Sequence, residues 1–239
     1  GEAGHDRKDI TTLIDSFIRS FKNNPSSTRP ALILKTSSAT FSVIDRNDML
    51  RKIKKRITKS GIKNPPNIYL IHGDLSPSEL NELYNHPKVK AHVSFTKGEG
   101  FGRPLLEASL SGKPVIATNW SGHIDFLKHS VLLPGNLQEI HKSAVWDKVL
   151  VKGSRWFYVN VPYAEKVLKD VFKNYKNYLP NAKKLKFSKE FSLEKTKEKF
   201  LDIMNTKVVS QVSLSLPQLK PLGEKSPKMK LPKLKKMEA

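Results

Sequence analysis

The chain has 239 residues, a formal net charge of +21 at pH 7 and a hydrophobic content of 38%. This length is sufficient for one sizeable core or two small ones. The absence of cysteine excludes disulfides and thiolate metal sites. No run approaches the roughly 20 apolar residues of a membrane helix, and residues 1–9 hold no apolar core, so we expect no signal peptide. The charge indicates either a polyanionic or phosphate-bearing partner or a solvated, lysine-rich surface.

Along the chain, short apolar runs alternate with segments of helical periodicity. Apolar residues at three- and four-residue spacing predict helices, and short continuous apolar runs predict strands. The pattern predicts helices over residues 9–21, 48–60, 76–85, 104–110 and 124–128, and strands over residues 31–36, 67–73, 90–96, 113–119 and 130–134. This alternation is typical of β-α-β units. We therefore expect an α/β fold, a Rossmann-like parallel sheet with helices on both faces.

The pattern changes after Gly135. Two apolar clusters flank a Gly-Ser turn within residues 145–161, and helical periodicity returns over residues 163–178 and 193–204. Residues 206–239 carry eight lysines and two glutamates without a useful period, which indicates a basic disordered tail. The predicted organisation is a Rossmann-like nucleotide-sugar-binding domain over residues 1–145, C-terminal helices packing on it over residues 146–205, and the tail.

The most informative stretch follows the third predicted strand and reads G-E-G-F-G-R-P-L-L-E over residues 98–107. Ligands of parallel α/β sheets bind in the loops at the carboxyl ends of the strands, where this stretch lies. Its glycines allow the backbone to approach a ligand closely, and the helix that follows offers unpaired N–H groups and a partial positive charge. The stretch therefore predicts a phosphate site flanked by two carboxylates, Glu99 and Glu107.

The segment from Glu99 to Gly122 resembles the donor-binding core of glycosyltransferase group 1, a family of retaining, family 4-like sugar transferases with the GT-B fold. In order, it holds a Glu-x7-Glu spacing, a Gly-Phe-Gly-x-Pro turn, a Glu-Ala helix and a Gly-x-Pro-Val-Ile-Ala strand. Arg7-Lys8 resembles the start of the family's first helix, and the segment over residues 191–194 resembles the opening of its last. The resemblance covers roughly residues 4–204.

The resemblance implies the C-terminal, donor-binding half of a GT-B enzyme. Such an enzyme has a further Rossmann-like domain that mainly holds the acceptor, so we expect this chain to be a fragment, a truncated product or one partner of a split enzyme. The family's habits also imply a role in polysaccharide or lipopolysaccharide assembly.

Individual roles toward a nucleotide-diphosphate sugar also follow from the resemblance. Glu99 is the candidate catalytic residue and faces the sugar, while Glu107, on the first turn of its helix, accepts hydrogen bonds from the ribose hydroxyls. The candidate donor-binding residues are Arg7, Lys8, Gly100, Phe101, Gly102, Glu107, Ser121 and Gly122. The alternative interpretation is that the two glutamates are an ordinary loop acid and a helix N-terminal acid, and that Arg7 and Lys8 are surface charge.

We expect no cofactor and no metal, because the family does not need one, there is no acidic D-x-D pair, and the histidines lack metal-ligand spacing. The expected partners are a nucleotide sugar, a separate acceptor-binding domain or chain, and a weakly bound anionic membrane surface contacted by the tail. No specific nucleic acid is expected, since no motif that reads DNA or RNA occurs. The expected location is the cytoplasm, with peripheral membrane contact.

Three functions remain open at the level of sequence. The first is a transferase, or its donor-binding half, that moves a hexosyl group to an unknown acceptor with retention. The second is a non-catalytic nucleotide-sugar-binding subunit or pseudoenzyme that needs a partner. The third is a basic scaffold that binds nucleic acid or a membrane surface through its lysine-rich helices and tail.

Overall fold

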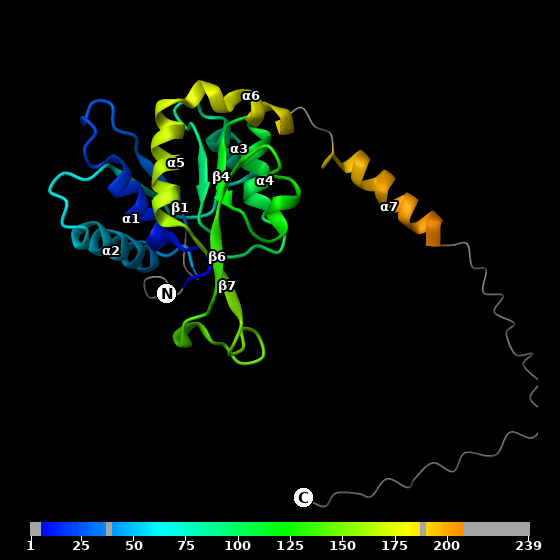
Figure 1. Cartoon of the computed structure of the whole chain (residues 1–239), viewed down its shortest axis with the longest axis horizontal. Helices are drawn as coiled ribbons and strands as arrows, with labels where there is room; N and C mark the ends of the chain where they lie inside the picture. Colours follow the sequence, from blue (N-terminus) through cyan, green and yellow to red (C-terminus); the bar gives the residue numbers. More distant parts are fainter. Residues whose placement is uncertain (1–5, 37–39, 187–189, 208–239) are drawn as a thin grey trace, which may run out of the picture. The chain divides into compact units, whose positions relative to one another are not determined.

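The structure, a computed structural model, describes residues 6–36, 40–186 and 190–207 (Figure 1). Contacts divide the chain into two compact units, residues 1–188 and residues 189–239. Most of the predicted tail, from residue 208 onward, lies outside the described residues. The domain boundary predicted at residue 145 stays a prediction.

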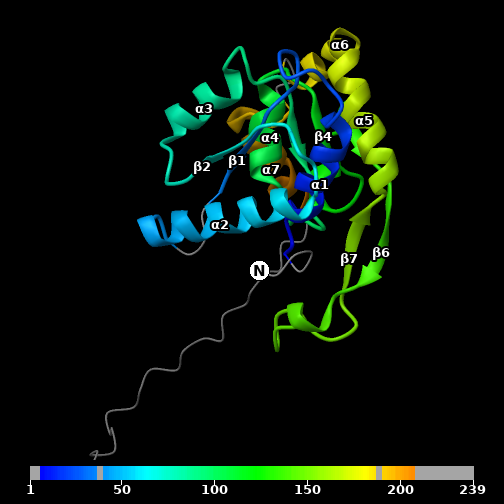
Figure 2. The ribbon, with the colours of Figure 1, turned by 90° about the vertical axis from the view of Figure 1, so that its left-hand side faces the viewer.

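Parallel strands form two sheets in the described part of the first unit (Figure 2). One sheet pairs β1 (Leu32–Lys35) with β2 (Ile68–Ile71), and the other has the order β3 (His92–Ser94), β4 (Val115–Thr118) and β5 (Val131–Leu133). The central strand β4 is buried at all four positions, as expected for a strand covered on both faces. The predicted Rossmann-like α/β fold is confirmed.

Helices connect these strands and cover both faces of the sheets. Helix α1 (Ile10–Phe21) precedes β1, and the connections between strands are α2 (Val43–Lys59), α3 (Pro77–Asn85), α4 (Arg103–Leu110) and the short 3-10 helix η1 (Gly122–Asp125). At the start of α3, the Glu79 N–H donates to Ser76 Oγ at 3.2 Å and the Ser76 N–H donates to the Glu79 carboxylate at 2.7 Å, which is a capping box.

Helix α2 begins five residues before its predicted start at residue 48. Ser42 caps it, because its hydroxyl accepts a hydrogen bond from the Asp45 N–H at 3.1 Å. The first two helical residues, Val43 and Ile44, are 68% and 83% exposed. They do not continue the buried stripe, so periodicity alone could not detect this turn.

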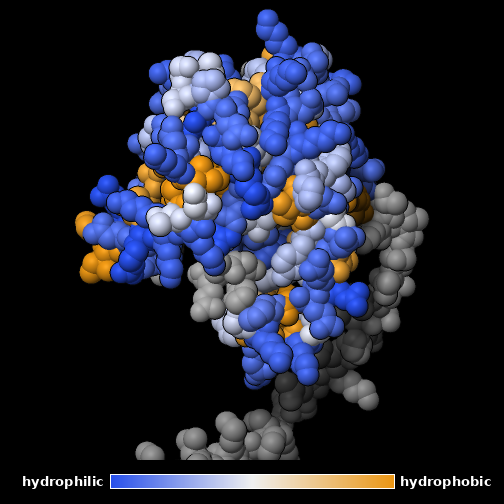
Figure 3. All heavy atoms as spheres, turned by 60° about the vertical axis from the view of Figure 1, so that its left-hand side comes forward, coloured by the Kyte–Doolittle hydropathy of each residue, from blue (hydrophilic) through white to orange (hydrophobic). Residues whose placement is uncertain are grey.

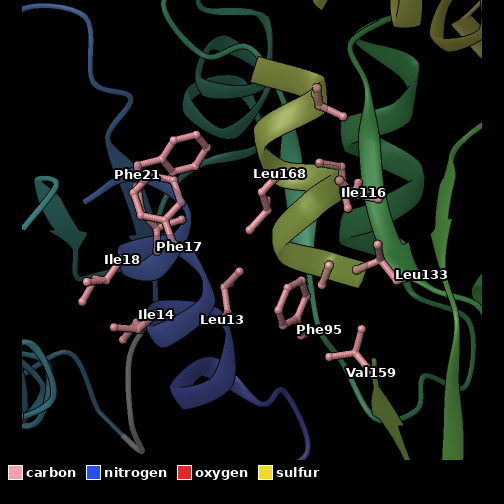
Figure 4. Packing of buried hydrophobic residues seen from close by; sticks show 14 of the residues in the cluster. Leu13, Ile14, Phe17, Ile18, Phe21, Phe95, Ile116, Leu133, Val159 and Leu168 are labelled. Atoms are coloured by element: carbon pink, nitrogen blue, oxygen red, sulfur yellow. The ribbon is translucent and has the colours of Figure 1, made fainter. Parts of the chain in front are cut away.

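One hydrophobic core joins both parallel sheets to the helices around them (Figure 4). Its centre is the apolar stripe of α1, which lies against α5 (Val161–Lys173). The stripe consists of Leu13, Ile14, Phe17, Ile18 and Phe21, all at most 6% exposed. Fully burying side chains of this size contributes about 1.5–3 kcal/mol each, so this cluster fixes α1, and the turn before it, on the sheet.

A β-hairpin forms over residues 135–159, where the sequence indicated no strand and only two apolar clusters within residues 145–161. Strands β6 (Gly135–Glu139) and β7 (Arg155–Val159) pair antiparallel, with the 3-10 helix η2 (Lys142–Ala144) in the connection between them. A Cβ at Gly135 would lie 2.1 Å from the Tyr158 carbonyl oxygen, so only glycine allows this approach. The hairpin extends away from the parallel sheets in Figures 1 and 2.

The helix predicted over residues 163–178 is two helices. Helix α5 ends at Lys173 and α6 (Tyr175–Lys186) follows, because Asn174 leaves the helical conformation at φ −111° and ψ 32°. The periodic apolar pattern continues across Asn174, so the sequence pattern did not reveal the break between the two helices. Asn174 Nδ2 donates to Asp170 Oδ1 at 2.8 Å, and this bond favours the turn.

The second unit contains α7 (Leu193–Lys207), which matches the helix predicted from residue 193. Ser192 Oγ accepts a hydrogen bond from the Lys195 N–H at 3.2 Å and caps it. None of the helices in the described segments is long and apolar enough to cross a membrane. Figure 3 shows hydrophobic patches separated by predominantly hydrophilic surface, in keeping with the net charge of +21.

Candidate functional site

The candidate site lies where β3 and β4 end. β3 leads through residues 95–102 into α4, and β4 leads through residues 119–121 into η1. Thr118 Oγ1 donates to the Thr96 carbonyl oxygen at 2.7 Å and ties the two strand ends together. Because parallel strands end at a common edge of the sheet, the glycine-rich stretch and the Ser121-Gly122 turn meet there.

Glu99 lies at the centre of this cluster, with a side chain that is 9% exposed. Arg7 Nη1 lies 2.9 Å from Oε2, and Lys8 Nζ contacts Oε1. Thr96 Oγ1 donates to Oε1 at 2.7 Å. Burial opposes ionisation of this carboxyl, but the hydrogen bonds from Lys8, Thr96 and Arg7 outweigh it and lower the pKa of Glu99. The carboxylate is therefore charged and oriented at neutral pH.

Arg7 and Lys8 reach Glu99 from the turn before α1. Arg7 Nη1 also donates to the Gly98 carbonyl oxygen at 2.5 Å. Both basic side chains remain 47% exposed, so each presents further N–H groups to solvent. The structure thus brings together three predicted site residues that lie about 90 positions apart in the sequence.

The second loop fixes the backbone at Glu99. The Glu99 N–H donates to Ser121 Oγ at 2.8 Å, and the Gly122 N–H donates to the Glu99 carbonyl oxygen at 3.1 Å. A Cβ at Gly122 would lie 1.9 Å from the Gly100 carbonyl oxygen. Ser121 and Gly122 therefore hold the loop in place through the hydroxyl of one and the small size of the other.

Helix α4 points its N-terminus into this region. Its N-cap is Gly102, at φ +89°, which has no side chain to cap the first N–H groups. A Cβ there would lie 3.0 Å from His123 Cβ, so glycine is favoured by space as well as conformation. The centroids of the Phe101 and Phe126 rings lie 5.1 Å apart, so the Phe101 side chain helps to anchor the turn.

Glu107 has a different environment. It is the fifth residue of α4, because the helix begins at Arg103 rather than at the predicted residue 104, so it lies in the second turn rather than the first. Arg103 Nε lies 3.0 Å from Glu107 Oε1, with side chains 79% and 32% exposed. Burial, reinforced by the negative charge of Glu107, raises the pKa of the nearby Tyr84 to about 12. No contact described here joins Glu107 to the Glu99 cluster.

Sequence reasoning missed three residues that organise the site. Thr96 binds the Glu99 carboxylate, and Lys97 and Asp9 form a buried ion pair beside it, 3.6 Å between Lys97 Nζ and Asp9 Oδ1. The available signal was a polar Thr-Lys pair that ends an apolar strand run directly before the motif. A lysine in such a run indicates an internal partner, because lysine is almost never fully buried unless it is paired.

Two further side chains border the site. His123 is fully buried, and its Nε2 lies 2.7 Å from the Thr118 carbonyl oxygen. Burial lowers the pKa of His123, so the ring is neutral at pH 7. Trp120 stacks on Phe157 of β7, with ring centroids 6.2 Å apart and an interplanar angle of 6°. The hairpin thus supports the loop that carries Ser121.

Within residues 6–36, 40–186 and 190–207, no group of three or more His, Asp or Glu side chains lies close enough together to hold a metal ion. The polar groups of the site are instead two half-exposed cations, two carboxylates and a helix N-terminus. This set suits a ligand with negatively charged phosphates and hydroxyl groups.

The chain is similar in fold to several solved glycosyltransferases. HepE of Anabaena, in complex with UDP and glucose, shares 14% identity and a TM-score of 0.53, over 84% of this chain and 45% of that one. A glycosyltransferase of Rickettsia africae shares 17% identity and a TM-score of 0.55, over 84% and 45%. WaaG, a glycosyltransferase involved in lipopolysaccharide biosynthesis, shares 17% identity and a TM-score of 0.54, over 84% and 44%.

This chain therefore spans less than half the length of these structures. No curated protein matches its sequence at a significant level. The profile of the family described as glycosyl transferases group 1 matches residues 6–149, which include the turn before α1, the Glu99 loop, α4 and the Ser121-Gly122 turn. The chain belongs to the group 1 glycosyl transferases.

Proposed function

We propose that the chain is the donor-binding half of a glycosyltransferase that transfers a hexosyl group from a nucleotide-diphosphate sugar, with retention, to an acceptor. One observation carries this proposal: Arg7, Lys8 and Glu99 meet beside the N-terminus of α4, at the carboxyl edge of a parallel sheet. The complexes of HepE with UDP and with UDP-glucose support a nucleotide sugar as the ligand class.

The diphosphate would bind between the two basic residues and the helix. Arg7 and Lys8 keep half of their side-chain surface exposed while Glu99 orients them. Charge-assisted hydrogen bonds to phosphate are roughly twice as strong as neutral ones. The N-terminus of α4 adds the partial positive charge of the helix dipole. When the donor bond breaks, this field would stabilise the charge that develops on the departing nucleoside diphosphate.

The hydroxyl groups of the donor would bind the two carboxylates. Glu99 is ionised and fixed, so it can accept hydrogen bonds from the sugar and is the proposed catalytic residue. Glu107 lies about one helical turn beyond the N-terminus of α4, and its carboxylate would accept hydrogen bonds from the ribose hydroxyls. We propose that no metal takes part, since the two cations and the helix end can neutralise the diphosphate.

The second candidate is a nucleotide-sugar-binding subunit without transferase activity of its own. The contacts of the Glu99 carboxylate favour it, because Arg7, Lys8 and Thr96 already engage both of its oxygens. In either case we propose a cytoplasmic protein that works with an acceptor-binding domain or chain and contacts anionic membrane weakly through its basic tail.

Calorimetric titration of the full chain with UDP and with GDP tests nucleotide binding. We expect one of them to bind, and Glu107→Ala to weaken that binding by at least about 10-fold, or 1.4 kcal/mol. Glu82→Ala is the matched control, since Glu82 is an exposed carboxylate on α3. Equal binding heats for wild type and Glu107→Ala would remove the ribose role of Glu107.

Donor turnover separates the two candidates. A transferase half should hydrolyse or transfer the sugar of the donor that it binds, faster when an acceptor-binding domain is added. A non-catalytic subunit should bind the same donor and leave it intact under both conditions. Chromatographic separation of the donor from free nucleoside diphosphate gives the answer directly.

A further inference from the structure

Lys97 occupies an unusual position two residues before Glu99. Its side chain ends in an ammonium group and is fully buried, at 0% exposure. Removing an ammonium group from water is unfavourable unless the group is paired. Because the side chain does not reach solvent, Lys97 cannot contact a donor directly. We therefore consider the segments of the protein that Lys97 connects.

The backbone of Lys97 joins two segments that are distant in sequence. Its N–H donates to the Arg7 carbonyl oxygen at 2.8 Å, and its own carbonyl oxygen accepts from the Phe157 N–H at 3.1 Å. One residue therefore connects the turn that carries Arg7 and Lys8 to strand β7 of the hairpin. The adjacent Thr96 binds the Glu99 carboxylate.

The ammonium group continues the same connection. Lys97 Nζ lies 3.6 Å from Asp9 Oδ1, and it stands over the rings of Trp156 and Tyr158, 5.1 Å and 4.6 Å from their centroids. The electron-rich faces of aromatic rings attract a desolvated cation. Both rings come from β7, so the side chain links the same two segments as the backbone.

Asp9 takes part in this ion pair although its backbone conformation and its burial are both unfavourable. It adopts the left-handed conformation at φ +49°, which is uncommon for residues other than glycine, and it is 2% exposed. Thr12 Oγ1 donates to Asp9 Oδ1 at 2.8 Å. Burial raises the pKa of Asp9, even though Lys97 acts in the opposite direction. Asp9 directly follows Arg7 and Lys8, so its conformation sets where they point.

We propose that Lys97 is a positioning residue that, through Asp9 and the β7 aromatic rings, holds Arg7 and Lys8 against Glu99 in the geometry that receives a diphosphate. The proposal rests on the proposed function for its ligand. We call the Lys97–Asp9 ion pair the bridge. It contacts both sides of the Glu99 cluster, because Asp9 follows Arg7 and Lys8 in the sequence and Lys97 precedes Glu99.

The first test compares Lys97→Met, Asp9→Asn and the double variant. Removing one partner strands the other in the interior, so each single variant should lose stability, and the double variant should recover most of that loss. If Lys97 positions the cations, the double variant should still bind the nucleotide at least about 10-fold more weakly than wild type. Binding within about two-fold of wild type in the recovered double variant would overturn the proposal.

Lys113→Met is the matched control for removing a lysine with interior contacts. Lys113 Nζ donates to the carbonyl oxygens of Tyr84 and His86, both at 2.6 Å, away from the Glu99 cluster. We expect this variant to lose stability while its nucleotide affinity stays within about two-fold of wild type. An equal loss of affinity would show that the effect is general destabilisation and would overturn the positioning role.

A second test does not depend on any donor. Lys8→Met and Glu99→Gln are combined in the wild-type and in the Lys97→Met/Asp9→Asn backgrounds, and thermal midpoints are measured. With the bridge intact, the changes in thermal midpoint caused by Lys8→Met and by Glu99→Gln should be non-additive by about 3 °C or more. Without the bridge, these two changes should add to within about 1 °C. Equal non-additivity in both backgrounds would refute the proposal. If wild type bound neither UDP nor GDP, the proposed function would fail, and this cycle would still decide the role of Lys97.

Discussion

The two carboxylates of the motif, eight residues apart, have contrasting environments. Glu99 is 9% exposed and contacts Arg7, Lys8 and Thr96, which come from two separate segments. Glu107 is 32% exposed, and its ionic contact is with Arg103 on its own helix. One end of the candidate site is therefore built by tertiary contacts before a ligand arrives. The other end depends on local helix geometry and is open to the ligand.

The difference separates a part of the candidate site that is fixed in advance, at Glu99, from a part that is accessible to solvent, at Glu107. Interactions fixed in advance require no reorganisation during the reaction, which is what a group near the reacting centre needs. A carboxylate on an exposed helix face costs little to maintain and can bind an outlying part of the ligand. Changes at the Glu99 end should therefore affect both stability and binding, and changes at the Glu107 end should affect binding alone.

Gly122→Ala should have the largest effect. The added Cβ would meet backbone atoms, 1.9 Å from the Gly100 carbonyl oxygen and 3.1 Å from the Glu99 carbonyl oxygen. Backbone cannot yield as a flexible side chain can, so we expect a loss of about 3 kcal/mol in the free energy of unfolding. Urea denaturation measures it. Gly98→Ala is the control, because its Cβ would have no neighbour within 4 Å; equal losses in both variants would contradict the close packing at Gly122.

Acidification should have the next largest effect on stability. Burial lowers the pKa of His92 on β3 to about 4, whereas the unfolded chain titrates near 6.5. The unfolded state then binds more protons between these values, so this contribution to stability is complete above about pH 6.5 and is lost progressively as the pH falls to about 4. His123, whose pKa is also lowered, adds a loss of the same sign.

Denaturation midpoints measured across that pH range test this prediction. His92→Gln should flatten the slope, because the residue that titrates differently in the two states is gone. His129→Gln, at an exposed position, should leave the slope as in wild type. A wild-type slope in His92→Gln would show that other groups cause the pH dependence.

Glu99→Gln should cost less, about 1–2 kcal/mol. The amide cannot pair with both Arg7 and Lys8, but these cations are half exposed and water compensates part of the loss. Unfolding curves give the stability, and nucleotide titration should show a loss of at least about 10-fold in affinity. Unchanged stability would mean that the ion-pair cluster contributes nothing to the fold.

Glu107→Gln should have the smallest effect on stability, within about 0.5 kcal/mol, because an exposed pair four residues apart on a helix contributes about 0.3–0.5 kcal/mol. Nucleotide affinity should nevertheless fall by at least about 10-fold if the carboxylate binds the ribose. Arg103→Ala removes the same helix pair and serves as control. A stability loss in Glu107→Gln as large as that of Glu99→Gln would erase the contrast between the two ends.

Much of the fold was predictable from sequence because it depends on local patterns. The stripe of α1 and the cap of α3 both lie within a few residues of the structures that they specify. The hairpin was missed, because its pairing joins Gly135 to Val159, 24 residues apart. The break at Asn174 was missed for a different reason, since apolar periodicity continues across it.

The amino-acid sequence alone determined the family, the order of helices and strands, and the two glutamates around a glycine turn, because periodicity, capping and spacing are encoded over short distances. Only the tertiary structure decided that Arg7 and Lys8 meet Glu99, and that Lys97 is buried between Asp9 and two aromatic rings. These contacts join residues about 60 to 90 positions apart. Such pairings depend on how the sheet and α1 pack around a common core, which no local pattern specifies.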